Sequence, residues 1–150
     1  MKSVFNPADV MELIYRINKL RPDSQPLWGK MTVAQMLAHT NVSYEMVYTD
    51  KHPRPNPFMK LILKMLVKNK VVGPAPYKHS APTAPAFLIK DEKNFEAEKI
   101  RLLSHLNQTQ QLGEAYFDNK ESHSFGKLSA AEWNIMFYKH LDHHLGQFGV

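Results

Sequence analysis

The feature that most constrains the fold is a pair of capping boxes, each followed by apolar residues at helical spacing. Thr32 precedes Gln35, and Ser129 precedes Glu132, by three positions, a pattern that marks a helix N-terminus. After Ser129, one set of side chains recurs at steps of three and four, the period of a single helix face: Trp133, Met136, Phe137, His140, Leu141, His144 and Phe148. The sequence therefore predicts a helix whose apolar face carries two histidines.

Three further helices are predicted upstream. One begins at Asn6, a capping residue followed by proline at the first helical position, and ends before Pro22. Another runs from Thr32 to about residue 50, and a third covers roughly 94–111, where Gly113 ends it. No segment shows the alternation of a convincing strand. We therefore expect an all-α four-helix bundle that occupies residues 1–150 as a single domain.

The connection between the second and third helices is long, rich in proline and strongly basic. From Lys51 to Lys90 it contains eight Lys or Arg residues and no acid. Within it, residues 57–72 could form an amphipathic helix that lies on an anionic membrane surface. We favour a helix packed across the mouth of the bundle with its lysines in water, because the segment is short and has one aromatic anchor. A homodimer through this segment is a further interpretation, because its apolar side needs a cover.

The composition excludes several classes of function. The chain has no cysteine, which rules out disulfides, thiolate zinc sites and a cysteine nucleophile. The N-terminus lacks a signal-peptide pattern, and the longest apolar stretch is too short to span a bilayer, so we expect a cytoplasmic protein. The net charge of +5 comes from the one basic connection, which is dominated by lysine. This distribution argues against nucleic-acid binding, because arginine is the better ligand for phosphate.

The histidines carry the strongest chemical signal. His140 and His144 are four residues apart in a predicted helix, so both rings stand on one face. Helices use this spacing to present two imidazoles to one metal ion. His39 lies on the second helix, and facing helices of a bundle are where interior metal sites form. Spacing alone leaves other interpretations open, namely polar residues near a helix C-terminus and a core histidine bonded to a backbone carbonyl.

Two fragments of the chain resemble the DinB-like superfamily. KHLDHHLGQF is similar to that superfamily's last helix, which has two histidines four apart followed by glycine and glutamine. WGKMTVAQMLAHTNVSYEMV resembles its second helix, in which Trp28, Thr32 and His39 occupy the positions of the tryptophan, the cap and the metal histidine. HSFGKLSAAEWNIMFYKHLDHHLGQFG is closer to a branch catalogued only as a domain of unknown function. The resemblance implies a DinB-like bundle in which His39, His140 and His144 bind one divalent metal ion.

A three-histidine site of this kind favours zinc or nickel, with iron, cobalt and manganese as alternatives. Three protein ligands leave coordination positions open for water or substrate, as in catalytic sites. The superfamily includes bacterial transferases that use low-molecular-weight thiols and some hydrolase-like members. The resemblance therefore implies a metal-dependent enzyme with a small-molecule substrate, most concretely a small-thiol S-transferase. The competing hypothesis is a non-catalytic metal- or ligand-binding module, including one with a role in stress responses.

Four residues are candidates for the surroundings of the metal. His143 could be an alternative ligand or a proton shuttle, and Gln147 could hold a metal-bound water or cap a carbonyl group. His123 lies in the loop before the last helix, which could close over the site, and Trp133 could line the pocket. Each also has a purely structural interpretation, as a solvated loop residue, a helix cap or a core aromatic.

Overall fold

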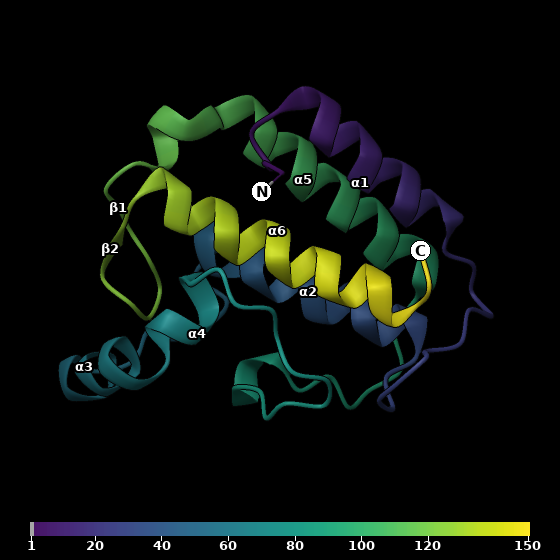
Figure 1. Ribbon diagram of the computed structural model, residues 1–150. Helices are drawn as coiled ribbons and strands as arrows, with labels where there is room; N and C mark the ends of the chain where they lie inside the picture. The colour runs from purple at the N-terminus through teal and green to yellow at the C-terminus, as the bar shows by residue number, and fades with distance from the viewer. Residues whose placement is uncertain (1) are drawn as a thin grey trace.

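Four long helices enclose the hydrophobic core of the protein. A computed structural model describes residues 2–150, and Figure 1 shows α1 (Pro7–Lys19), α2 (Val33–Tyr48), α5 (Phe95–Phe117) and α6 (Ala130–Gln147) packed side by side. Two shorter helices bring the described chain to six α-helices, and one 3-10 turn adds to them. The prediction of a mainly helical domain is therefore confirmed. The prediction that strands are absent is wrong, because β1 (Lys120–Glu121) pairs with β2 (Lys127–Leu128).

The predicted helix caps are all present. The Asn6 side chain accepts hydrogen bonds from the backbone N–H groups of the first turn of α1. At the starts of α2 and α6, the hydroxyls of Thr32 and Ser129 accept from the backbone N–H three residues ahead, and the side chains of Gln35 and Glu132 bond back to the capping residues. These reciprocal bonds satisfy amide groups that a helix start leaves unpaired. Local sequence therefore fixes where both histidine-bearing helices begin.

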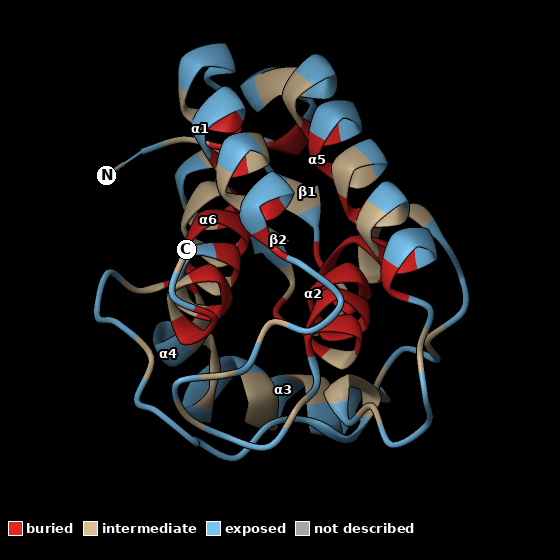
Figure 2. Ribbon diagram, turned by 90° about the vertical axis from the view of Figure 1, so that its right-hand side faces the viewer, coloured by how far each residue is buried: buried red, intermediate tan, exposed pale blue. Residues whose placement is uncertain are grey.

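The core lies on the inner faces of the four long helices, coloured red in Figure 2. The helix α2 is the most enclosed of them, since from Val33 to Glu45 only Gln35 is not buried. A residue in the middle of α2 is therefore interior whichever way it points. The largest fully buried side chains include Trp133, Tyr44, Phe117, Phe137, Leu13 and Ile17.

The helix α5 does not end at Gly113 as predicted. Gly113 has φ +71°, which breaks the helical path, but one further turn continues to Phe117. Glycine tolerates this left-handed conformation, so the chain bends here without terminating. The buried Phe117 ring then packs against Trp133 and Phe137 of α6, which explains why the extra turn folds back onto the core.

The connection between α2 and α5 forms a layer along one side of the molecule (Figure 1). It contains α3 (Pro57–Leu66), α4 (Lys68–Val72) and the 3-10 turn η1 (Pro85–Phe87). The buried ammonium of Lys139 on α6 donates to the carbonyls of Lys70, Gly73 and Ala75 over 2.9, 2.6 and 3.1 Å. Three carbonyl acceptors satisfy the three ammonium protons, so this lysine fastens the connection to α6.

The lysines of the basic segment follow the prediction that they would lie in water only in part, because Lys64 and Lys70 are exposed whereas Lys60 and Lys68 are half-buried. Lys60 forms an ion pair with Glu121, and Lys68 forms one with Glu132 at 2.7 Å. Meanwhile none of residues 57–66 is buried, and several apolar side chains of α3 face solvent. Glu121 and Glu132, both distant in sequence, hold Lys60 and Lys68 against the molecule, and apolar groups of α3 are left outside. Among the helices of residues 2–150, none has the length and apolar character needed to cross a membrane.

Candidate metal centre

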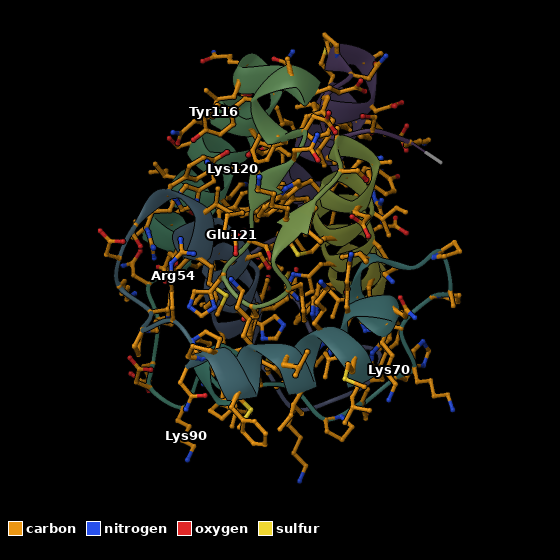
Figure 3. The ribbon with its side chains drawn as sticks, turned by 90° about the vertical axis from the view of Figure 1, so that its left-hand side faces the viewer. Arg54, Lys70, Lys90, Tyr116, Lys120 and Glu121 are labelled. Atoms are coloured by element: carbon orange, nitrogen blue, oxygen red, sulfur yellow. The ribbon has the colours of Figure 1, made fainter. Side chains whose placement is uncertain are left out.

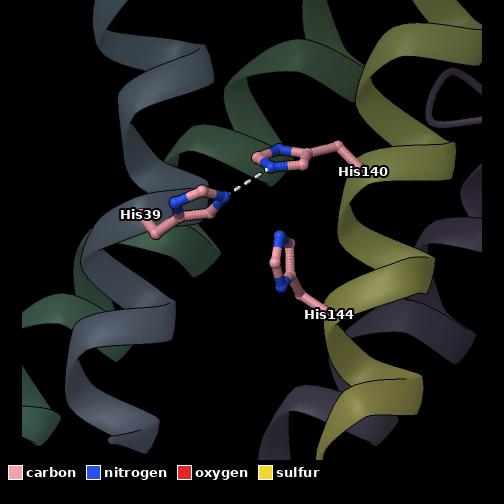
Figure 4. Close-up of side chains that lie close together, drawn as sticks. All are labelled: His39, His140 and His144. Carbon is pink, nitrogen blue, oxygen red and sulfur yellow. Dashed lines mark hydrogen bonds between the residues drawn. The ribbon is translucent and has the colours of Figure 1, made fainter. Parts of the chain in front are cut away.

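Three histidines meet between α2 and α6. His39 extends from α2 and faces His140 and His144, which stand one turn apart on α6 (Figure 4). Each contributes a ring nitrogen, and these nitrogens all lie within 4.8 Å of one another. The ring centroids are 4.9, 4.5 and 4.8 Å apart for the three pairs. The predicted ligands therefore form a cluster that could hold a metal ion.

The site is largely withdrawn from water. His39 is 5% exposed and His144 is 7% exposed, whereas His140 is partly exposed. His39 is interior because α2 is the enclosed helix of the fold, and His144 follows the inner face of α6. Buried imidazoles need partners, because an unpaired polar group away from water is costly. The hydrogen bonds of each ring therefore show which of its two nitrogens is left to bind a metal ion.

The Nδ1 atom of every ring in the cluster has a partner of its own. His39 Nδ1 donates to the carbonyl oxygen of Phe87 over 2.8 Å. His140 Nδ1 lies 3.0 Å from Ser43 Oγ, and His144 Nδ1 donates to Gln147 Oε1 over 2.8 Å. Such bonds fix the orientation of an imidazole and are typical of histidines that ligate metal ions through the opposite nitrogen. The arrangement leaves the three Nε2 atoms to face the shared space.

Gln147 links the site to the loop before α2. While its Oε1 accepts from His144, its Nε2 donates to the carbonyl oxygen of Trp28 over 2.7 Å. Gly29 lies directly against this amide, and a Cβ placed on it would come within 2.8 Å of Gln147 Nε2. Gln147 thus orients a candidate ligand, His144, and also caps the carbonyl group of Trp28. Capping a carbonyl group was one of its two predicted roles.

Electrostatics keep the three imidazoles neutral at neutral pH. Burial lowers the pKa of His144 to about 3 and lowers that of His140 well below its usual range, with the neighbouring histidines adding to both effects. Burial also lowers the pKa of His39, although the bond to Phe87 opposes the shift. A metal ion binds imidazole only in its neutral form, so a cluster held neutral loses no affinity to competing protons near pH 7.

A wall of aromatic rings lies beside the cluster. Phe87 and Tyr77 present edges to the His140 ring at centroid distances of 5.7 and 6.3 Å. His143 lies against Tyr77 and Trp28 at 5.6 and 5.7 Å and is not one of the three clustered residues. Its predicted role as an alternative ligand therefore has no support in the geometry, and it belongs to this wall.

Two other predicted site residues lie elsewhere. His123 is in the β1–β2 hairpin, where its ring contacts Ser124 and the carbonyl oxygen of His52. Trp133 is 1% exposed and stacks on Phe137 in the core, so it lines no pocket at the cluster. Its position seven residues before His140 places it two turns away along α6.

Three groups that orient the histidine rings, either directly or through Gln147, were not predicted from the sequence. Ser43 follows His39 by four residues, which is a readable signal because that spacing puts both side chains on one helix face. The carbonyl groups of Phe87 and Trp28 carry no such signal. Any residue has a carbonyl group, and only the path of the chain decides where it points.

Comparison with known proteins identifies the family but not an activity. The model of the family described as a protein of unknown function, DUF1569, matches residues 5–149. The chain belongs to the DUF1569 family. No curated protein and no solved structure matches it. The matched DUF1569 range includes all three clustered histidines and both helices that carry them.

Proposed function

We propose that this DUF1569 protein is a metal-dependent enzyme of DinB-like type that binds one divalent ion through His39, His140 and His144. The observation that carries the proposal is the convergence of three ring nitrogens within 4.8 Å, with every Nδ1 atom anchored by its own partner. Histidines away from water need hydrogen-bond partners in any case, but here all three partners lie on Nδ1, which leaves the Nε2 atoms to face one shared space. The four long helices are compatible with the bundle of the DinB-like superfamily, whose sequence signatures the chain resembles.

The donor set fits a borderline transition metal. Neutral imidazole suits zinc, nickel, cobalt and iron, and we favour zinc or nickel. Such an ion, when bound, would act as a Lewis acid and lower the pKa of a thiol or water beside it. The protein's own contribution is orientation, because Phe87, Ser43 and Gln147 each fix one ring. Phe87 and Tyr77 also shield the His140 ring from bulk water.

The substrate we favour is a small thiol. His140 is the least buried residue of the three ligands, and Tyr77 lies beside its ring, so a substrate would meet the site on this side. In an S-transfer, the thiol sulfur would form a bond to an electrophilic carbon, the bond from that carbon to its leaving group would break, and the thiol proton would leave with that group or pass to solvent. Hydrolase-like chemistry is the alternative on the same principle, with water in place of the thiol.

A non-catalytic binding module is the competing function. The low exposure of His39 and His144 favours it, because a site that only stores or senses an ion needs no wide access. The two functions differ in what happens after the ion binds. An enzyme consumes thiol and electrophile together, whereas a binding module retains the ion without turnover.

Elemental analysis of the untagged protein tests the metal site. We expect about one metal ion per chain, as for a single site with three protein ligands, and its loss in the His140→Ala, His144→Ala double variant. His143→Ala is the matched control, because it removes a histidine from the same turn of α6 that lies outside the cluster. Circular dichroism verifies that each variant is helical. Failure of the wild type to retain zinc, nickel or manganese after incubation would exclude the metalloenzyme.

Activity is then measured on the loaded protein with a small thiol and an alkyl halide. Loss of free thiol above the uncatalysed rate, absent in His144→Ala, would support the S-transferase. Stoichiometric metal binding without turnover of thiols or of ester and amide substrates would favour the binding module.

A further inference from the structure

The helix α3 turns an apolar face to solvent. Phe58, Leu61 and Met65 follow one another at steps of three and four, so they share one side of the helix, and they are 73%, 55% and 71% exposed. Met59 and Leu66 beside them are also exposed. A cluster of large apolar side chains on the surface of a soluble domain usually marks an interaction site.

The same region carries excess positive charge. Of the eight basic residues between Lys51 and Lys90, three form ion pairs with carboxylates of the protein: Lys51, Lys60 and Lys68. The other five are exposed and have no carboxylate partner within residues 2–150: Arg54, Lys64, Lys70, Lys78 and Lys90. Figure 3 shows Arg54, Lys70 and Lys90 distributed around α3, with the helix along the lower edge of the molecule. Unneutralised cations therefore lie near both ends of the helix that carries the apolar face.

We propose that α3 and the basic residues around it form a docking surface for an anionic lipid membrane. An interfacial helix combines large apolar side chains, which enter the boundary between headgroups and acyl chains, with Lys and Arg that attract anionic headgroups. Both features occur here in α3 and the connection that flanks it. Lys64 follows Leu61 by three residues and so lies beside it at the edge of the apolar face, where its flexible stem can run along apolar surface while the ammonium reaches a phosphate.

Other occupants fit the same surface less well. A second copy of the chain in a two-fold dimer would bring this patch against itself and place five unpaired cations opposite five more. A nucleic acid would neutralise the charge but would leave Phe58 and Met65 without an apolar partner. An anionic membrane satisfies both the apolar face and the charge.

The fold presents α3 as a preformed element. Lys60 and Lys68 tie the segment to Glu121 and Glu132, while Leu63 packs on the core from the opposite side of the helix. The helix has ten residues and is thus about 15 Å long. It lies at the edge of the molecule opposite α1 (Figures 1 and 2), where a flat surface can reach it. Docking therefore needs no unfolding, which reduces its entropic cost.

Vesicle co-sedimentation of the full-length protein tests the proposal. The probes are vesicles of phosphatidylcholine alone and vesicles of phosphatidylcholine mixed with phosphatidylserine. We expect binding to the mixed vesicles, at least about tenfold weaker binding to the neutral ones, and loss of binding as salt shortens the range of the electrostatic attraction. Equal binding to both kinds of vesicle, or to neither, would overturn the proposal.

A matched pair of double variants locates the surface. Phe58→Ser with Met65→Ser should reduce the partition coefficient by about tenfold or more, since each of these side chains would be buried in lipid. The control is Tyr15→Ser with Met11→Ser, which removes an aromatic residue and a methionine that are 62% and 71% exposed on α1. Because all four residues are exposed, both variants should fold, and only the α3 pair should lose binding. An equal loss in both would contradict the proposal.

Two further experiments complete the test: charge-reversal variants and a measurement of the oligomeric state in solution. Lys64→Glu with Lys70→Glu should weaken binding to anionic vesicles and leave the weak neutral binding unchanged. Light scattering without lipid should give a monomer. A dimer that dissociates in the Phe58→Ser, Met65→Ser variant would assign the face to a second copy and overturn the lipid proposal.

Discussion

The Nε2 atoms of His39 and His140 lie 2.9 Å apart, so one of them must carry the proton between them. His39 Nδ1 faces a carbonyl oxygen and has to be the protonated nitrogen of its ring, which makes His39 Nε2 the acceptor. His140 Nε2 is therefore the donor, and its Nδ1 accepts from the hydroxyl of Ser43. To serve as a ligand through Nε2, His140 must move its proton to Nδ1. The serine hydroxyl permits this, because it can accept as readily as it donates.

Ser43→Ala should weaken metal binding by about 10- to 100-fold, the usual effect of removing a partner that orients a ligand histidine. Without the hydroxyl, the Nδ1 proton of His140 would have no acceptor in the metal-bound form. A competition titration with a chromophoric chelator measures the change. Ser43→Thr restores a hydroxyl and should retain most of the affinity. Unchanged affinity in Ser43→Ala would show that His140 needs no such partner.

Tyr44→Phe should stabilise the protein by about 1 kcal/mol, because the hydroxyl of Tyr44 is buried without a hydrogen-bond partner among residues 2–150. Its ring stacks on Phe137 at 4.8 Å and would remain in place. Tyr48→Phe, one turn further along α2, is the control. The Tyr48 hydroxyl bonds to Thr109 Oγ1 over 2.7 Å, so its loss should destabilise by about 1 kcal/mol. Urea denaturation distinguishes the two, and a destabilised Tyr44→Phe would contradict the prediction.

Local signals in the sequence predicted the helices well, because their causes are local. A capping box such as Thr32 with Gln35 acts within one turn, and so does the spacing of His140 and His144. The strands β1 and β2 were missed because each has two residues, which is too short to show alternation. Gly113 marked a real break in α5, but the turn beyond it depends on Phe117 reaching the core.

Contacts distant in sequence account for the rest. The amphipathic pattern of residues 57–72 was visible, yet which side faces water depends on the ion pairs to Glu121 and Glu132, each of which spans more than sixty residues. At the candidate site, His39 was predicted to be a metal ligand only through the family resemblance. A single histidine on a helix face has no second histidine nearby in the sequence to indicate a metal site. The carbonyl of Phe87, which binds the His39 ring, and that of Trp28, which holds Gln147, were beyond prediction, since they depend on the path of the loops around residues 28 and 87.

Glu45→Gln should remove a pH dependence of stability in the acid range. Burial alone would raise the pKa of Glu45, but hydrogen bonds from His52, Arg101 and Lys51 outweigh it and lower the pKa from 4.5 to about 2. Between these values the unfolded chain binds more protons, so the stabilisation is complete above about pH 4.5 and is lost as the pH falls toward 2. The loss is on the order of 2–3 kcal/mol.

Thermal unfolding of wild type and Glu45→Gln across this range gives the measurement. The two curves of stability against pH should converge at low pH, since the wild-type carboxylate is protonated there. Glu114→Gln, which alters an exposed carboxylate of α5, should keep the wild-type slope. A Glu45→Gln curve parallel to that of the wild type would assign the acid sensitivity to other groups.

Gly29→Ala should lower the free energy of unfolding by more than the strain of its positive φ angle alone would account for. Gly29 has φ +81° and Gly126 has φ +77°, a region that costs a residue with a side chain about 1–2 kcal/mol. A Cβ at Gly126 would meet no atom of the described chain within 4 Å, whereas one at Gly29 would lie 2.8 Å from Gln147 Nε2. Gln147 is 3% exposed and holds both Trp28 and His144, so it cannot yield without breaking a hydrogen bond.

Gly126→Ala therefore measures the backbone strain, and the excess loss in Gly29→Ala measures the contact with Gln147. That excess should disappear when Gly29→Ala is combined with Gln147→Ala, which makes the pair a double-mutant cycle. Metal affinity should fall in Gly29→Ala and stay at the wild-type level in Gly126→Ala, because only the first disturbs the partner of His144. Equal unfolding free energies for the two alanine variants would mean that Gln147 adapts freely, and Gln147 could not then be what orients the His144 ring.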